Sequence, residues 1–241
     1  SSKFSFVIPT KNRPKYLHDT LLSLLYQSYQ NIEIIVSDDS DNDDSLKIAN
    51  QFRGDSRLKY IKPTRSNMTM VEHFEWATSQ SSGEYTLLFP DRSVLLNGAL
   101  EILDKVISSN RGIDAIYYPW LCYDEKKNIF IKDHVPNMTS GYINNRQIAA
   151  RFLSEPENLY ILPRNLNTCY SKRIAQEIRK KFGGLFMPLN PDFSFAFLLL
   201  ALQNKIFYLN QPLFISQGLS ISTGNKLATG YLHGMTINEM F

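Results

Sequence analysis

The chain has 241 residues, a formal net charge of +3 at pH 7 and a hydrophobic content of 43%. These values are typical of a folded domain with its own core, and they argue against disorder and against a nucleic-acid-binding protein with concentrated basic charge. Two cysteines, Cys122 and Cys169, are too few for a disulfide scaffold or a four-cysteine zinc site.

The first ninety residues alternate between strand-like and helix-like segments. Short apolar runs predict buried strands, and leucines at helical spacing after Pro14 predict an amphipathic helix. In chain order, we expect strands at 4–8, 32–36, 58–61 and 85–89 and helices at 14–27, 43–52 and 71–80. Strands that alternate with helices indicate a mostly parallel sheet flanked by helices.

The second half has a less regular pattern. We expect helices at 97–109, 144–153, 171–182 and 191–203, strands at 115–118, 206–209 and 213–216, and a loop or hairpin at 119–143. The tail from Gly218 is polar and predicts a loop. No apolar run reaches the roughly 20 residues that a membrane-spanning helix needs.

Polar side chains cluster at the points where predicted strands end. One cluster spans Thr10 to Arg13, a second is Asp38 with Asp39, and a third is Asp91 with Arg92. Because open parallel sheets bind ligands beyond the carboxyl ends of their strands, we expect these clusters to form one site.

Four sequence phrases resemble family 2 glycosyltransferases, which are inverting enzymes of the GT-A fold. The phrases are Val-Ile-Pro-Thr-Lys-Asn-Arg at 7–13, Leu-Leu-Ser-Leu-Leu-Tyr-Gln-Ser-Tyr at 21–29, Glu-Ile-Ile-Val-Ser-Asp-Asp-Ser at 33–40 and Ser-Gly-Glu-Tyr-Thr-Leu-Leu-Phe-Pro-Asp at 82–91. The resemblance implies a GT-A-like, Rossmann-type α/β fold in a single domain over 1–241. About 1–110 would bind a nucleotide-sugar, and about 111–241, irregular and ending in the tail, would bind the acceptor.

The resemblance also implies the residues that contact the donor. Asp38 or Asp39 would accept a hydrogen bond from the base or the ribose, and the turn after the first strand would hold the base. Alternatively, Asp38 and Asp39 cap the following helix and Arg65 is an ordinary surface residue. The implied donor-binding residues are Pro9, Thr10, Asn12, Arg13, Asp38, Asp39, Arg65, Asp91 and Arg92.

The acidic motif departs from the family pattern, in which two carboxylates flank one residue and hold a divalent cation. Here the motif reads Asp91-Arg92-Ser93, so a hydroxyl stands where the second carboxylate is expected. We expect Mg²⁺ or Mn²⁺ to be held by Asp91, with His233 as a further ligand. The alternatives are that Arg92 takes over the charge neutralisation, that catalysis is lost, or that Ser93 caps a helix start.

The resemblance places the catalytic base at the start of a late helix, where Asn190-Pro191-Asp192 fits. Asp192 would take a proton from the acceptor hydroxyl. The first turn favours its ionised form, unless the phenylalanines that follow raise its pKa. The alternative is a purely structural acid in a first helical turn.

Together these features predict an inverting glycosyltransferase that moves one sugar from a nucleotide-diphosphate sugar, typically UDP-linked, to a glycan or lipid-linked acceptor in bacterial surface polysaccharide synthesis. The main alternative is a nucleotide-sugar or glycan-binding module without catalysis. A nucleotidyltransferase is a third, although Pro9 to Arg13 contains no glycine for a phosphate loop. The opening residues read as a strand instead of a signal peptide, so we expect a cytoplasmic location. The basic residues between Lys172 and Lys181 would allow contact with the inner membrane face, and the alternative is an ordinary solvated helix face.

Overall fold

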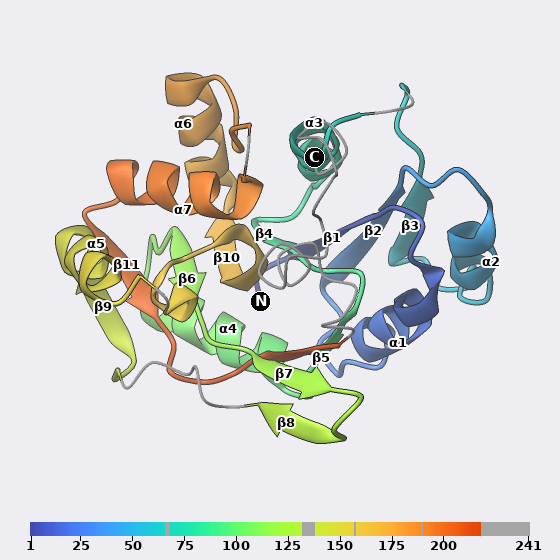
Figure 1. The fold of residues 1–241 in the computed structure, drawn as a ribbon, viewed down its shortest axis with the longest axis horizontal. Helices are drawn as coiled ribbons and strands as arrows, with labels where there is room; N and C mark the ends of the chain where they lie inside the picture. The colour runs from blue at the N-terminus through green and yellow to red at the C-terminus, as the bar shows by residue number, and fades with distance from the viewer. Residues whose placement is uncertain (66–67, 132–137, 157, 189, 218–241) are drawn as a thin grey trace.

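The computed structural model describes residues 1–65, 68–131, 138–156, 158–188 and 190–217, which form an α/β fold built on two sheets (Figure 1). The larger sheet has eight strands in the order β3-β2-β1-β4-β10-β6-β11-β9, and the smaller has four in the order β5-β12-β7-β8. Helices cover both faces of the larger sheet (Figure 1). The predicted fold class, a mostly parallel sheet flanked by helices, is confirmed.

Four parallel strands form the first half of the larger sheet. β1 pairs with β2 from Phe4 opposite Ile32 to Thr10 opposite Asp38, so the two strands end side by side. Every residue of both strands is buried, which explains why their sequences are largely apolar instead of alternating. These strands are β1 (Phe4–Thr10), β2 (Ile32–Asp38), β3 (Leu58–Ile61) and β4 (Tyr85–Leu88).

The second half of the larger sheet is mixed in direction. β10 is antiparallel to both β4 and β6 and therefore joins the two halves. Nothing in the sequence pattern predicted β10, because only four residues pair there and a helix follows at once. The strands of this half are β6 (Ala115–Tyr117), β9 (Gly141–Asn144), β10 (Thr168–Ser171) and β11 (Lys205–Tyr208).

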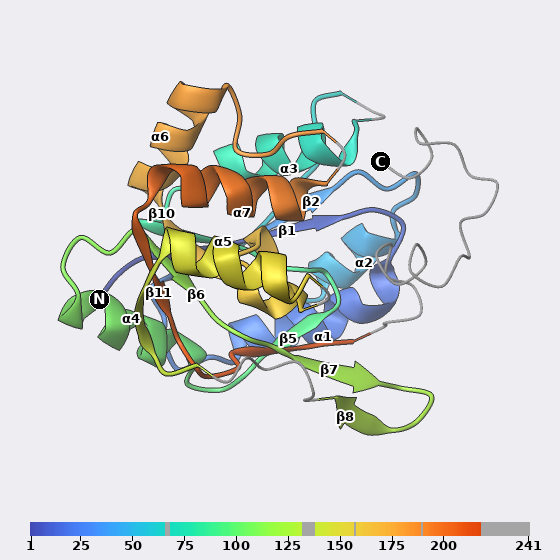
Figure 2. The same cartoon turned by 60° about the vertical axis from the view of Figure 1, so that its left-hand side comes forward.

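The two faces of the larger sheet contact different helices. On β1, Phe4, Phe6 and Ile8 belong to the cluster that includes α1 and α4, whereas Val7 packs with Ala77 of α3. Helices α6 and α7 lie on the same side as α3 (Figures 1 and 2). The helices are α1 (Pro14–Leu25), α2 (Asp44–Asn50), α3 (Met70–Ser79), α4 (Ala99–Ser109), α5 (Asn145–Ser154), α6 (Lys172–Phe182) and α7 (Pro191–Leu202), with 3-10 turns η1 (Leu159–Ile161) and η2 (Asn165–Asn167).

The smaller sheet lies below the larger one, and its β7–β8 hairpin projects from the body (Figure 2). The hairpin falls inside the segment 119–143, where a loop or hairpin was predicted. Ser93 does not cap a helix, because it begins β5 and pairs with Ser216 of β12. The strands are β5 (Ser93–Leu95), β7 (Leu121–Asp124), β8 (Ile129–Ile131) and β12 (Phe214–Ser216).

Within the described residues, no helix combines the length and the apolar character needed to cross a membrane. The most apolar helix, α7, has 12 residues.

Candidate active site

The loops after β1, β2 and β4 meet at the carboxyl edge of the parallel strands. The Asp39 amide donates to the Thr10 carbonyl at 3.1 Å, which joins the first two loops. The Thr10 hydroxyl donates to Asp91 Oδ2 at 2.8 Å, which joins the first loop to the third. The three polar clusters found in the sequence therefore lie together, as parallel strand direction required.

The turn between β1 and α1 is tied to the loop after β2 by further contacts. Lys11 Nζ lies 2.9 Å from Asp39 Oδ2, and the Asn12 amide donates to Ser40 Oγ at 2.7 Å. Asn12 has φ of 53°, a left-handed conformation that asparagine tolerates better than most residues. Pro9 is buried in β1, where it pairs with Ser37.

The two neighbouring acids Asp38 and Asp39 differ in how many groups of the protein contact their carboxylates. Asp38 is 1% exposed and accepts hydrogen bonds from the Tyr60 hydroxyl at 2.5 Å and the Ser40 amide at 2.9 Å, one on each oxygen. Asp39 has a single side-chain partner within the described residues, Lys11. Of the two candidates that the sequence left open, Asp39 thus has the freer carboxylate.

Asp91 follows β4 and is 2% exposed. Arg13 Nε lies 3.3 Å from Asp91 Oδ2, the same oxygen that accepts from Thr10. Burial raises the pKa of Asp91 above its ordinary value, while Arg13 and the Thr10 hydroxyl favour the charged form. Asp91 is therefore held by the turn before α1, and it positions that turn in return.

Arg92 is anchored to the end of the last described strand. Its Nη1 donates to Ser216 Oγ at 2.8 Å and to the Gln217 carbonyl. Burial lowers the pKa of Arg92, and the charged groups that act on it include Arg13, Asp91 and Asp192. Arg92 therefore acts electrostatically on both the acid after β4 and the acid at the start of α7.

A divalent cation is poorly matched by the side chains described in this part of the protein. The described residues contain no group of three or more His, Cys, Asp and Glu side chains that could hold a metal ion. Asp91 is a lone carboxylate already bonded to Thr10 and Arg13, and the Ser93 hydroxyl is buried without a hydrogen-bond partner in the described chain. His233 lies outside the described residues. The Mg²⁺ or Mn²⁺ requirement stays a prediction.

Asp192 occupies the first turn of α7, as predicted. The Asn190 side chain caps this helix by accepting from the amides of Asp192 at 3.1 Å and Phe193 at 3.3 Å. Burial raises the pKa of the Asp192 carboxyl, and Arg164 and Arg92 act against that rise. The apolar surroundings anticipated in the sequence therefore do affect this acid, but two arginines oppose them.

Arg164 was not found from the sequence, although its charge acts on the candidate base. It precedes η2 and is 7% exposed, and its guanidinium lies 4.9 Å above the Trp120 ring and 5.7 Å from the Phe193 ring. The available signal was a single arginine directly after the apolar stretch Leu159-Tyr160-Ile161-Leu162-Pro163.

Arg65 lies apart from these groups. It pairs with Glu72 at 2.5 Å, and the same glutamate completes the capping box of α3 with Thr69. Its contact with a donor base or phosphate stays a prediction.

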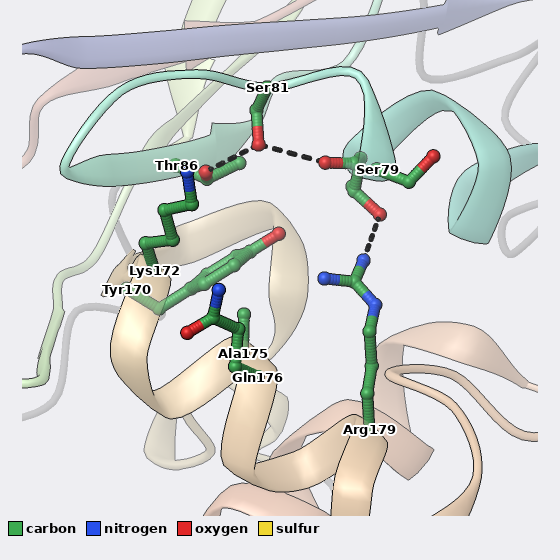
Figure 3. Close-up of a pocket in the computed structure, with 9 residues that line it drawn as sticks. Ser79, Ser81, Thr86, Tyr170, Lys172, Ala175, Gln176 and Arg179 are labelled. Carbon is green, nitrogen blue, oxygen red and sulfur yellow. Dashed lines mark hydrogen bonds between the residues drawn. The ribbon is translucent and has the colours of Figure 1, made fainter.

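A separate cavity of about 220 Å³ lies between α3, α6 and the sheet (Figure 3). Hydroxyls of Ser81, Thr86 and Tyr170 line it, together with Lys172 and Arg179 of α6 (Figure 3). Thr86 pairs with Ser5 near the amino end of β1, so this cavity lies away from the carboxyl edge that carries Asp39 and Asp91.

The chain matches the sequence profile of glycosyl transferase family 2 over residues 5–153, which is more than half of its length. It belongs to that family. The match includes the loops after β1, β2 and β4 that meet at the carboxyl edge. The candidate site therefore lies within the part of the chain that matches the family.

Named relatives cover only parts of the chain. It is 33% identical over 116 residues to the GalNAc(5)-diNAcBac-PP-undecaprenol beta-1,3-glucosyltransferase of Campylobacter jejuni, covering 48% of this chain and 37% of that protein. It is 30% identical over 112 residues to the abequosyltransferase RfbV of Salmonella typhimurium, covering 45% and 34%. The chain thus spans little more than a third of the length of these two relatives.

The overall fold also matches a solved structure. The crystal structure of S. aureus TarS 1–349 in complex with UDP-GlcNAc superposes with a TM-score of 0.70 at 18% identity, covering 90% of this chain and 58% of that one. This likeness establishes the GT-A fold of the chain.

Proposed function

We propose that this chain is the catalytic region of an inverting glycosyltransferase that moves one sugar from a nucleotide-diphosphate sugar to a glycan or lipid-linked acceptor. The observation that carries the proposal is the meeting of the loops after β1, β2 and β4, which the Asp39–Thr10 and Thr10–Asp91 hydrogen bonds join. Arg92 acts electrostatically on both Asp91 and Asp192, which supports one site for the donor residues and the candidate base.

The donor would lie along the carboxyl edge of the parallel strands. Asp39, with its freer carboxylate, would accept from the base or ribose, and the turn from Thr10 to Arg13 would border the nucleotide. Arg92 would offer positive charge to the diphosphate as it leaves, since a guanidinium matches phosphate geometry. The TarS complex with UDP-GlcNAc supports a uridine donor.

In the reaction, Asp192 would accept the proton of the acceptor hydroxyl. The hydroxyl oxygen would form a bond to the anomeric carbon on the face opposite the nucleotide. The bond from that carbon to the diphosphate oxygen would break, and the nucleoside diphosphate would leave with the electron pair. Attack from the opposite face inverts the configuration of the sugar.

The names of two relatives support the acceptor class and the biological setting. One is named for an undecaprenol-linked substrate, and the other transfers abequose. A lipid-linked acceptor in bacterial polysaccharide synthesis would bring this chain to the inner membrane face. On α6, Arg179 is engaged with Glu75, which leaves Lys180 and Lys181 exposed for contact with anionic lipid.

A binding module without catalysis is the second candidate, and Ser93 favours it, because its buried hydroxyl replaces the second carboxylate of the acidic motif. Calorimetric titration with UDP-, GDP- and dTDP-sugars, in EDTA and in Mn²⁺, would identify the donor. A donor-hydrolysis assay would then separate enzyme from module.

We expect binding and slow hydrolysis of one donor and a sharp fall in hydrolysis for Asp91→Ala. Stimulation by Mn²⁺ would support the predicted metal requirement despite the poor fit of the described side chains, and full activity in excess chelator would contradict it. Tight binding with neither hydrolysis nor transfer to a panel of lipid-linked and free glycans would favour the module, and absence of binding to every nucleotide-sugar would contradict both candidates.

A further inference from the structure

Arg164 is a buried arginine whose charge the fold does not neutralise by direct contact. It is 7% exposed, and its Nε is buried without a hydrogen-bond partner among the described residues. No carboxylate in the described chain lies within ion-pair distance of its guanidinium. Burying a charge without a partner costs several kcal/mol in general, so such a residue is seldom kept for stability alone.

Aromatic rings hold the guanidinium in place. It lies over Trp120 at 4.9 Å and near Phe193 at 5.7 Å, an arrangement that favours a cation on electrostatic grounds. The Trp120 ring is itself nearly parallel to those of Tyr160, at 4.0 Å, and Phe214, at 6.0 Å. The cation therefore lies against a cluster of packed aromatic rings.

The acid that this cation acts on most is Asp192. Phe193, whose ring centroid lies 5.7 Å from the guanidinium carbon, is the residue after Asp192 in the first turn of α7, and α7 packs against η2. In the described chain, the charged groups that act on Asp192 are Arg164, from the segment before η2, and Arg92, from the segment before β5. The Asp192 carboxylate has no hydrogen-bond partner of its own in that part of the chain.

We propose that Arg164 is a positioning residue that keeps the Asp192 carboxylate ionised, and so ready to accept a proton, before any substrate binds. The proposal rests on the assignment of Asp192 as the base. It explains why a charge is buried beside that carboxylate without contacting it: the carboxylate stays free to meet the acceptor hydroxyl.

The physical need for such a cation follows from the site. Burial raises the pKa of Asp192, and a protonated acid cannot act as a base. Arg164 opposes that rise and remains charged at every working pH. Removing its charge should leave the base protonated up to a higher pH.

The test is the pH dependence of kcat for transfer in wild type, Arg164→Met and Arg164→Lys. Methionine keeps an apolar stem between the rings and removes the charge. We expect the acid limb of the Met variant to move up by about one pH unit, which is a tenfold loss of rate below the limb, with the rate recovered at high pH and KM nearly unchanged. The Lys variant should restore most of the wild-type profile, and Arg111→Gln, an exposed position, should match wild type.

Two results would overturn the proposal. An unchanged acid limb in the Met variant would show that Arg164 does not act on the base. A rise in KM with an unchanged limb would show that Arg164 binds substrate instead. Because replacing an unpaired buried charge with an apolar side chain seldom destabilises a fold, we expect the Met variant to unfold at no lower urea concentration than wild type. Arg164→Gln serves as a second uncharged variant if Met alters the packing.

A measurement without substrate separates this proposal from the proposed function. The Asp192 carboxyl can be titrated by carbon-13 NMR in the wild type and in the Met variant, with Asp192→Asn used to assign the signal. A higher titration midpoint in the variant supports the pairing even if the chain transfers no sugar. Equal midpoints contradict it even if transfer is confirmed.

Discussion

The carboxylates near the two ends of the parallel sheet differ in the direction of their pKa shifts. At the amino end, Glu33 of β2 accepts hydrogen bonds from the Ser5 hydroxyl, from Ser82 and from the Lys59 ammonium. Burial alone would raise the pKa of Glu33, but these bonds outweigh it and lower that pKa to about 2. At the carboxyl end, burial raises the pKa of both Asp91 and Asp192.

The difference separates a structural carboxylate from a candidate functional one. Glu33 has its hydrogen-bonding capacity met within the fold, so it stabilises the protein and has little to offer a ligand. Asp192 has no hydrogen bond to its carboxylate within the described residues, and the charges of two arginines act on it. A perturbed carboxylate that the fold leaves unsatisfied is a better candidate for chemistry than one that is satisfied.

The strongest test of this comparison replaces a carboxylate with the matching amide near each end of the sheet. Asp192→Asn removes the base but keeps the size of the side chain, so we expect the transfer rate to fall at least about a hundredfold while the donor Kd changes less than twofold. The measurements are initial rates of transfer and calorimetry with the donor. Glu33→Gln is the matched control: it should destabilise the fold but leave the rate per folded molecule unchanged. A normal rate in Asp192→Asn would remove this residue from the mechanism.

The second test disturbs the amino end through its backbone. A Cβ added at Gly83 would lie 2.5 Å from Ser5 Oγ and 2.8 Å from the Lys3 carbonyl. We expect Gly83→Ala to lower the free energy of unfolding by about 2–3 kcal/mol. The reason is that β1 cannot move away from the new Cβ without breaking the hydrogen bond between Ser5 and Glu33. Gly54→Ala, with no atom within 4 Å of its added Cβ, is the control and should cost little. Equal urea midpoints for the two variants would show that the packing around Gly83 is looser than described.

The smallest effect concerns the charge of Glu33 and its pH dependence. Its pKa in the folded protein, about 2, lies below the ordinary value of 4.5, so its contribution to stability is present above pH 4.5 and is lost as the pH falls toward 2. We expect Glu33→Gln to cost about 2 kcal/mol at pH 7 and much less near pH 3. Urea unfolding of both proteins at pH 7, 4 and 3 measures the difference. A cost that stays constant with pH would show that the network stabilises the neutral form equally well.

The regular half of the chain was predictable because local pattern and tertiary position agree there. Apolar runs predicted β1 and β2, and leucine spacing predicted α1. Because parallel strands end at the same edge of a sheet, the meeting of Thr10, Asp39 and Asp91 could be predicted as well. The start of α7 was also predictable from the sequence, since Asn190 caps the helix and Pro191 lies in its first turn.

Other features had no local signal. β10 is short and takes its direction from the two strands that it joins, and Ser93 entered a strand because β12, far along the chain, lies beside it. One of the hydrogen bonds that Asp38 accepts comes from Tyr60 of the neighbouring strand β3, so it depends on how the strands pair.

By itself, the sequence determined the alternation of strands and helices and the acid at the start of α7, because each depends on residues close together in the chain. It also determined the polar edge of the sheet, because parallel strands end at the same edge. Tertiary structure alone decided which carboxylates are satisfied and which are not. It placed Ser5, Lys59 and Ser82 around Glu33 and set Arg164 on the Trp120 ring beside Asp192. The charge state of a buried acid depends on every group packed around it, and those groups come from segments far apart in the chain.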